Sequence, residues 1–303
     1  MPQPDSARTL PRRVAFVGLG VMGYPMAGHL AGAGHAVAVY NRTASKAADW
    51  LAGHKGHPGA ASATTPAQAA RGTSVVFTCV GNDDDLRAVV LGAEGVFAGM
   101  AAGATLVDHT TTSASVAREL YAAARDRGLH FVDAPVSGGQ SGAVNGMLTV
   151  MCGGDEAAIE AVRPLMMAYS RAVTRIGASG DGQLAKMVNQ ICIAGLVQAL
   201  SEGIAFGERA GLDMARVLDV ISKGAAQSWQ LENRGGTMLA DQFDFGFAVK
   251  WMIKDLGITL EEAERHGSEL PVTALVARFY EEISGQGGDQ WDTSSLVRRL
   301  RKT

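Results

Sequence analysis

The sequence predicts an α/β protein: an N-terminal, doubly wound and largely parallel sheet, then a long connecting helix and an all-α C-terminal domain. Short apolar runs alternate with amphipathic stretches from Val14 to about Gly177, as in right-handed strand–helix–strand units. After Ser179 we find no convincing strand, and helical periodicity dominates. The 303 residues also suggest about two domains of roughly 150 residues each.

Each element is predicted from its own pattern. Gly34 is a stop signal for the first helix, and Asp213 is an expected helix N-cap. Strands are expected at 14–17, 36–41, 74–80, 105–110, 130–137, 147–154 and 172–177. Helices are expected at 21–34, 115–128, 155–169, 179–210, 213–225, 248–267 and 271–286. The predicted domains are a flexible tail at 1–13, a dinucleotide-binding domain at 14–178 and a helical substrate and oligomerisation domain at 179–303, with the connecting helix at 179–210.

Composition narrows the class of protein. Hydrophobic residues make up 47% and charged residues 19% of the chain, which is typical of a soluble globular protein. The net charge of −3, without a basic run, gives no support for a nucleic-acid partner. The first residues lack the apolar core of a signal peptide, and no segment has the ~18 uninterrupted apolar residues of a membrane span. Cys79, Cys152 and Cys192 lie in apolar runs, which predicts reduced core cysteines and a cytoplasmic location. We expect no metal site.

A glycine pattern follows the first strand. The segment VAFVGLGVMGYPMA contains Gly18, Gly20 and Gly23 in the spacing G-x-G-x-x-G, between a predicted strand and a predicted helix. In a Rossmann unit the first glycine makes the turn, the second admits the pyrophosphate, and the third lets helix and strand pack. The alternative is a glycine-rich turn of another α/β protein. The context favours a dinucleotide-binding site.

The end of the second strand bears on which dinucleotide binds. An NAD site usually has Asp or Glu there, about 20 residues on, to bind the ribose 2′-hydroxyl. This chain has Asn41, Arg42 and Thr43, with Lys46 further on and no carboxylate in the segment. A guanidinium suits a 2′-phosphate, so NADP is favoured and NAD remains possible. The alternative is that Arg42 is only a solvated loop residue, with weak or dual cofactor preference.

Four ordered motifs carry a family resemblance. The segments VDHTTTSAS, FVDAPVSGGQSGAVNGML, GQLAKMVNQ and KDLG follow the glycine pattern in that order. Together they resemble the β-hydroxyacid dehydrogenases, relatives of 6-phosphogluconate dehydrogenase that include 3-hydroxyisobutyrate dehydrogenase, tartronate semialdehyde reductase and the glyoxylate/succinic semialdehyde reductases. The resemblance spans roughly Val14 to Leu296.

The resemblance implies roles for particular residues. Lys186 would be the catalytic lysine with Asn189 beside it, and Thr111 would lie near nicotinamide and substrate. The substrate would be bound by Ser137, Gly138, Gly139 and Lys254. Where many members have Ser-Thr, this chain has Thr110-Thr111, which keeps a hydroxyl but adds a methyl group. Including the glycine turn and its surroundings, we expect the cofactor to be contacted by Gly18, Leu19, Gly20, Met22, Gly23, Asn41, Arg42, Thr43, Val80, Thr111, Lys254 and Asp255.

The residue types fit reduction of a carbonyl. Negative charge develops on the carbonyl oxygen during hydride transfer, and a lysine ammonium stabilises that charge and donates a proton. Burial lowers a lysine pKa from its free value of ~10.4 towards the working range. Asn189 and Gln190 follow Lys186 at i+3 and i+4, so the three form a polar patch at one end of an otherwise apolar helix. Backbone N–H groups of a Ser-Gly-Gly turn suit a substrate carboxylate.

Each assignment has a structural alternative. In the structural alternative, Lys186 would be an ordinary surface lysine, and Ser137 to Gly139 would form an ordinary loop. Thr110 and Thr111 would cap the following helix. Asp108 and Asp133, at strand ends, are expected to be structural, each holding its own turn.

The sequence therefore predicts an oxidoreductase that transfers a hydride between NADP(H) and the CH–OH or carbonyl group of a short β-hydroxyacid or semialdehyde. Lys186 would be the general acid/base. One alternative is an imine reductase of the same superfamily, which generally lacks a lysine and a Ser-Gly-Gly turn at these places. Another is a dinucleotide-binding module without catalysis. The expected partners are a small carboxylate substrate and further copies of the chain, in a homodimer or homotetramer, with no nucleic acid or membrane.

Overall fold

The computed structural model describes residues 10–301. The chain divides into two compact units, one ending at Lys186 and the other beginning at Met187, and each is described by itself. Residues 1–9 of the predicted tail lie outside the described residues, and the first strand begins at Arg13. The domain limits at 14–178 and 179–303 remain a prediction, because compactness alone does not establish which part folds independently.

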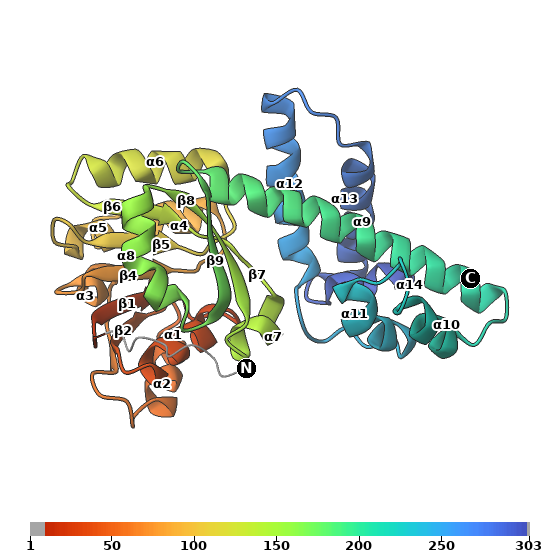
Figure 1. Ribbon diagram of the computed structural model, residues 1–303, viewed down its shortest axis with the longest axis horizontal. Helices are drawn as coiled ribbons and strands as arrows, with labels where there is room; N and C mark the ends of the chain where they lie inside the picture. Colours follow the sequence, from red (N-terminus) through yellow and green to blue (C-terminus); the bar gives the residue numbers. More distant parts are fainter. Residues whose placement is uncertain (1–9, 302–303) are drawn as a thin grey trace. The chain divides into compact units, whose positions relative to one another are not determined.

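The first unit is built on one twisted sheet (Figure 1). Its described strands follow the order β3-β2-β1-β4-β5-β6-β8-β7, and β9 also pairs with β8. The run from β3 to β6 is parallel, whereas β8 runs antiparallel to β6 and β7. The order 3-2-1-4-5-6 is that of the Rossmann fold, so the predicted fold class is confirmed. The strands are β1 Arg13–Val17, β2 Ala36–Tyr40, β3 Ala61–Ser62, β4 Val75–Thr78, β5 Thr105–Asp108, β6 His130–Asp133, β7 Val136–Ser137, β8 Leu148–Gly154 and β9 Ser170–Gly177.

Helices cover both faces of the sheet, as its nearly continuous apolar strands require. One core cluster joins the sheet to α1, α2 and α8 and includes the buried Trp50. The other joins the opposite face to α3, α4, α5 and α6 and includes Leu120. The helices of this unit are α1 Gly23–Gly32, α2 Ala44–Gly53, α3 Pro66–Ala70, α4 Asp83–Leu91, α5 Val96–Gly99, α6 Ala114–Arg125, α7 Gly139–Val144 and α8 Glu156–Met166.

The segment predicted as a single strand at 130–137 is two strands. β6 ends at Asp133 and β7 begins at Val136. Pro135 lies between them and has no N–H to donate to a ladder, so the pairing breaks there. β7 then pairs antiparallel with β8. The two-residue β3 was not predicted, because Ala61 and Ser62 are both exposed and carry no apolar pattern.

The second unit is helical. Among the described residues after Gly177 there is no strand, only an isolated bridge between Ala248 and Asp292. One core cluster packs α9 against α12 and α13, and a second packs α9 against α10 and α11. Asp213 caps α10 as predicted, accepting the Arg216 N–H. The elements are α9 Asp181–Arg209, which begins in the first unit, α10 Met214–Ile221, α11 Trp229–Leu239, α12 Val249–Arg265, α13 Pro271–Ile283, the turns η1 Ser284–Gly288 and η2 Thr293–Ser295, and α14 Leu296–Leu300.

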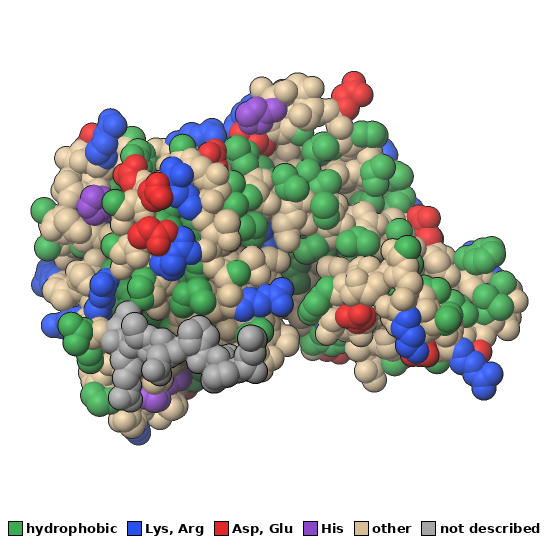
Figure 2. Space-filling view, in the orientation of Figure 1, with side chains coloured by type: hydrophobic (Ala, Val, Ile, Leu, Met, Phe, Trp, Pro, Cys, Tyr) green, Lys and Arg blue, Asp and Glu red, His purple; other side chains and the backbone are tan. Residues whose placement is uncertain are grey.

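The long helix α9 combines apolar composition with partial burial. By length and composition it could cross a membrane, with a mean hydropathy of 1.3 over 18 residues of which 44% are buried. This is weak evidence, because a core helix of a globular protein meets the same criteria. Cys192 lies exposed on α9, so the prediction of a core cysteine is wrong there, whereas Cys152 is buried and Cys79 half-buried. On the face seen in Figure 2, acidic and basic side chains are interspersed.

Candidate active site

The three glycines after β1 have different surroundings. Gly18 has φ +99°, and a Cβ there would lie 2.2 Å from the carbonyl oxygen of Cys79. A Cβ on Gly23 would lie 1.9 Å from the carbonyl oxygen of Gly18, so α1 packs on β1 only with glycine at this position. A Cβ on Gly20 would meet no protein atom within 4 Å. Nothing in the packing requires glycine at Gly20, which fits a backbone that must let a dinucleotide pyrophosphate approach.

The end of β2 supports this turn. The Asn41 side chain accepts the Leu19 N–H at 2.9 Å and donates to the Thr43 carbonyl at 3.0 Å. The Leu19 side chain is buried in the core, so only its backbone faces the turn. Arg42 follows, with its guanidinium 2.7 Å from the Asp85 carboxylate and its side chain 82% exposed. The residues predicted to discriminate between NAD and NADP thus lie beside the glycine turn.

Strands β4 and β5 are joined at their carboxyl ends by Asp108. Its Oδ1 accepts the hydroxyls of Thr78 at 2.6 Å and Thr110 at 2.7 Å. The Thr110 hydroxyl in turn accepts the Val80 N–H at 3.0 Å. Burial raises the pKa of Asp108 to about 7, although these hydrogen bonds oppose the shift. Asp108 therefore connects the predicted cofactor contact Val80 with the segment that carries Thr111.

The start of α9 is fixed to the end of β6. Asp133 accepts the N–H groups of Gly180 at 2.8 Å and Gln183 at 3.1 Å, and negative charge is favourable at a helix N-terminus. Gly180 has φ +93°, and a Cβ on Gly182 would lie 2.7 Å from the Asp133 carboxylate. Burial raises the pKa of Asp133 to about 6. Asp133 is structural, as predicted, but beyond its own turn it caps the helix that carries Lys186.

Ser137, Gly138 and Gly139 form a tight turn between β7 and α7. Gly138 and Gly139 have φ of +128° and +61°, which favours glycine at both positions. A Cβ on Gly139 would meet no protein atom within 4 Å. The strand before the turn begins near a buried contact, in which His109 Nδ1 donates to the Ala134 carbonyl at 2.6 Å.

That buried histidine is neutral. Burial lowers the pKa of His109 to about 4. Since a carbonyl can only accept, Nδ1 carries the proton, and Nε2 accepts from the Tyr169 hydroxyl at 2.8 Å. His109 thereby fixes the chain that leads to Ser137.

Lys186 is buried, with 8% of its surface exposed. The alternative of a surface lysine is therefore wrong. Lys186 follows Gln183 by one turn of α9, and Gln183 is fully buried against the Thr110–Thr112 segment.

The other predicted polar residues form a chain of contacts in the helical unit. Asn189 donates to the Gln190 side chain at 2.8 Å, and Gln190 donates to Asp255 Oδ2 at 2.7 Å. Lys254 lies 3.1 Å from Asp255 Oδ1. Three predicted residues, Asn189, Lys254 and Asp255, are thus brought together.

Two polar residues were absent from the predicted site. Gln190 links Asn189 to Asp255, and Gln183 contacts the threonine segment. The spacing had already placed Gln190, at i+4 from Lys186, in the polar patch of the helix, though not in the site, and Gln183 at i−3 was the matching signal that could have been used. The alternative role for Thr110 and Thr111 as helix caps is wrong, since Ser113 caps α6 through the Val116 N–H.

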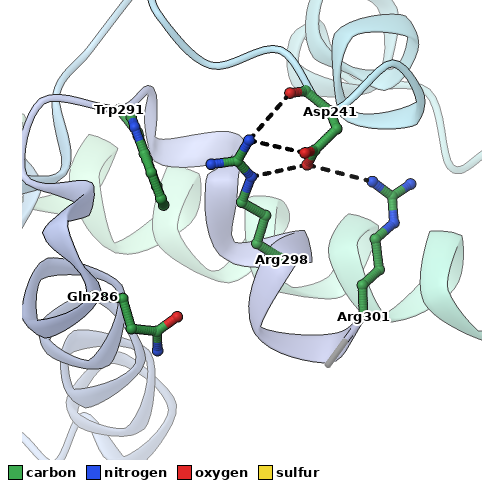
Figure 3. Close-up of a pocket in the computed structure, with 5 residues that line it drawn as sticks. All are labelled: Asp241, Gln286, Trp291, Arg298 and Arg301. Carbon is green, nitrogen blue, oxygen red and sulfur yellow. Dashed lines mark hydrogen bonds and ion pairs between the residues drawn. The ribbon is translucent and has the colours of Figure 1, made fainter. Parts of the chain in front are cut away.

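One surface cavity of about 500 Å³ lies in the helical unit, apart from these residues. Figure 3 shows Arg298 and Arg301 pointing at Asp241, and Arg298 lies 2.8 Å from its carboxylate and 4.2 Å from the Trp291 ring. The Arg298 guanidinium lowers the pKa of Asp241. The charges of this cluster are thus paired with one another within the helical unit. Among residues 10–301, no group of three or more His, Cys, Asp or Glu side chains is placed to hold a metal ion.

Both parts of the chain match domains of known dehydrogenases. Residues 13–177 match the NAD-binding domain of 6-phosphogluconate dehydrogenase. Residues 180–300 match the NAD-binding domain of NADP-dependent 3-hydroxyisobutyrate dehydrogenase. The chain is therefore an oxidoreductase that binds a nicotinamide dinucleotide. It belongs to the β-hydroxyacid dehydrogenase family, whose members act on small molecules at a CH–OH group.

Individual relatives are similar to this protein over nearly the whole chain. An uncharacterised oxidoreductase of Shewanella frigidimarina is 60% identical over 96% of this chain and 99% of its own length. The 2-hydroxy-3-oxopropionate reductase of Escherichia coli is 36% identical over 95% of this chain and 97% of its own length. A structure of Mycobacterium tuberculosis 3-hydroxyisobutyrate dehydrogenase with L-serine has a TM-score of 0.86 and 30% identity, covering 97% of this chain and 100% of that one.

Proposed function

We propose that this protein uses NADP(H) to interconvert a short β-hydroxyacid and its semialdehyde, with Lys186 as general acid/base. The observation that carries the proposal is the burial of Lys186 on α9, one turn after a glutamine fixed to the Thr110–Thr112 segment. Lysine is rarely buried without a specific role or partner. The similarity to the 2-hydroxy-3-oxopropionate reductase of Escherichia coli fits the proposed substrate class.

The glycine turn and the end of β2 would hold the cofactor. The open space beside Gly20 and the positive φ of Gly18 fit a bound pyrophosphate. Bound nicotinamide would supply or accept the hydride. The chain's own part is to place the substrate and to move the proton.

Lys186 would perform the proton transfer. In the reductive direction its ammonium group donates a proton to the carbonyl oxygen as negative charge develops there. In the oxidative direction the neutral amine accepts the hydroxyl proton. The substrate carboxylate would be held by backbone N–H groups of the Ser137–Gly139 turn, where glycine permits close approach. Lys254 would add a second positive charge.

Arg42 would confer a preference for NADP. Its ion pair with Asp85 is largely exposed, and such pairs stabilise by about 1 kcal/mol or less. A 2′-phosphate therefore competes easily for the guanidinium. We expect Arg42→Ala to weaken NADPH binding by roughly tenfold or more and to leave NADH binding nearly unchanged. Asp85→Asn should strengthen NADPH binding by up to about fivefold. Fluorescence titrations with both cofactors measure these effects, and equal losses for NADPH and NADH in Arg42→Ala would contradict the assignment.

A homo-oligomer and a cytoplasmic location belong to the same proposal. Exposed apolar side chains recur along α9 at Val188, Cys192, Leu196, Ala199 and Phe206. Burying such a row against a second copy would remove it from water. The three cysteines, two of them in apolar surroundings, fit a reducing compartment.

The substrate class can be tested directly. Purified protein is offered NADPH with glyoxylate, succinic semialdehyde, tartronate semialdehyde, methylmalonate semialdehyde or a cyclic imine, and NADPH consumption is followed by absorbance. The proposal predicts turnover of at least one carboxylate-bearing aldehyde and none of the imine. Turnover of the imine alone would favour the imine reductase. NADPH binding without any turnover would favour a non-catalytic module.

A further inference from the structure

We propose that Gln183 is a positioning residue that fixes the position of Thr111 relative to Lys186. The inference rests on the proposed function, because it concerns the same reaction. It adds a residue that contacts neither substrate nor cofactor in that mechanism and acts through the Thr110–Thr112 segment.

The Gln183 side chain bonds the chain on both sides of Thr111. Its Nε2 donates to the Thr110 carbonyl at 2.8 Å, and its Oε1 accepts the Thr112 N–H at 3.1 Å. Both polar ends of one amide are thus used by the residues that flank Thr111. A side-chain amide suits this arrangement, because its NH₂ group donates while its oxygen accepts.

Because they are buried, these two hydrogen bonds fix the position of the Thr110–Thr112 segment. Gln183 and Thr112 have no exposed surface, and Thr110 is 2% exposed, whereas Thr111 is half-buried. A buried backbone group that loses its partner cannot turn to water and costs the desolvation of that group. The segment therefore has one favourable position, in which Thr110 and Thr112 face Gln183.

Gln183 is itself fixed at the base of α9. Its N–H donates to Asp133 at 3.1 Å, beside the Gly180 N–H on the same carboxylate. Lys186 lies three residues further on in the same helix, one turn away. The helix that presents Lys186 is thus joined through one side chain to the segment that presents Thr111.

The far side of the segment is held as well. The Thr110 hydroxyl donates to Asp108 at 2.7 Å and accepts the Val80 N–H at 3.0 Å. Thr110 therefore connects α9 with the carboxyl ends of β4 and β5. Without the two Gln183 hydrogen bonds, Thr111 would shift relative to Lys186 while the strands stayed in place.

The first experiment measures turnover. Gln183→Met preserves the side-chain length and removes both hydrogen bonds. With the best aldehyde of the panel we expect kcat to fall roughly 10- to 100-fold, since misplacement by about 1 Å costs rates of this order. The dissociation constant for NADPH should stay within about threefold. The matched control is Gln198→Met, which removes a buried glutamine of the same helix bonded to Glu202 and should leave kcat unchanged.

A double-mutant cycle separates positioning from general destabilisation. If Gln183 acts through Thr111, adding Gln183→Met to Thr111→Ala should lower kcat by less than about threefold further. A full 10- to 100-fold loss in both backgrounds would overturn the proposal. So would an unchanged kcat in the single variant. If Gln183→Met does not fold, Gln183→Asn serves instead, since its amide is one methylene shorter and cannot reach both Thr110 and Thr112.

A second readout needs no turnover. Hydrogen exchange of the peptide that covers residues 109–113 should be at least tenfold faster in Gln183→Met, with the rest of the sheet unit unchanged. Unaltered exchange there overturns the proposal whatever reaction the wild-type chain catalyses. Failure of the proposed function is seen separately, as absent turnover of every aldehyde by the wild-type protein.

Discussion

Single residues of the glycine turn serve different purposes. Gly18 and Gly23 are required by the protein's own packing, since a Cβ at either would lie within 2.2 Å of a carbonyl oxygen. Gly20 meets no such neighbour. The sequence pattern predicts all three as part of a dinucleotide-binding turn, but it cannot distinguish packing from ligand approach. That distinction depends on the space around each Cα.

This difference can be measured. Gly20→Ala should leave the thermal midpoint nearly unchanged while weakening NADPH binding about tenfold or more, because the methyl group would meet only the ligand. Gly23→Ala should destabilise the fold itself, by about 1–3 kcal/mol. Calorimetry and fluorescence titration on both variants test this. A destabilised Gly20→Ala with normal NADPH affinity would contradict the role assigned to Gly20.

Asp108 predicts a dependence of stability on pH. Its pKa is about 7 in the folded chain against about 3.9 in an unfolded chain, so the folded state binds the proton more tightly. The stability that this group contributes is complete below about pH 4 and is lost as the pH rises through about 7. We expect the free energy of unfolding of the wild type to fall by about 2–4 kcal/mol over this range, relative to Asp108→Asn.

Thermal midpoints of both proteins between pH 4 and 8 provide the check. The variant is not expected to be flat, because Asp133 has a pKa raised in the same direction. A constant difference between wild type and variant at every pH would contradict the assigned shift.

At the level of elements, the sequence pattern predicted the longer strands of the sheet and several of the helices, because each carries its own apolar pattern. It missed the two-residue β3 and, among the helices, α2, α4 and α11. It failed where contacts with residues elsewhere in the chain determine the local structure. β7 exists because Val136 and Ser137 pair with Val150 and Thr149 of β8, 14 and 12 residues further along the chain. Gln183 was missed for the same reason, since its partners Thr110 and Thr112 lie more than 70 residues away in sequence.

The exposed face of α9 predicts association. Phe206 is 72% exposed and Leu196 is 42% exposed. In a homo-oligomer that uses this face, Phe206→Glu combined with Leu196→Glu should shift the protein towards monomer at micromolar concentration, measured by light scattering. Val272→Glu, an exposed valine on α13, is the matched control. A wild-type monomer, or an unchanged oligomer in the double variant, would contradict the proposed interface.

For the whole molecule, the family is established over nearly the full chain, and the predicted catalytic set divides between the two units. The sheet unit carries the glycine turn, Thr111, Ser137 and Lys186, and the helical unit carries the chain from Asn189 to Lys254. The sequence instead placed Lys186 in a helical domain at 179–303, whereas the compact sheet unit extends to Lys186, and the domain limits themselves stay a prediction. The substrate was not predictable, because side chains outside the shared motifs determine which small molecule fits.

The central claim is that Lys186 transfers the proton. The most direct test compares kcat of the wild type and Lys186→Ala with the best aldehyde substrate and saturating NADPH. We predict a loss of about 10²- to 10⁴-fold, the contribution of a positioned general acid, with NADPH binding retained. Turnover by Lys186→Ala at the wild-type rate would contradict the account.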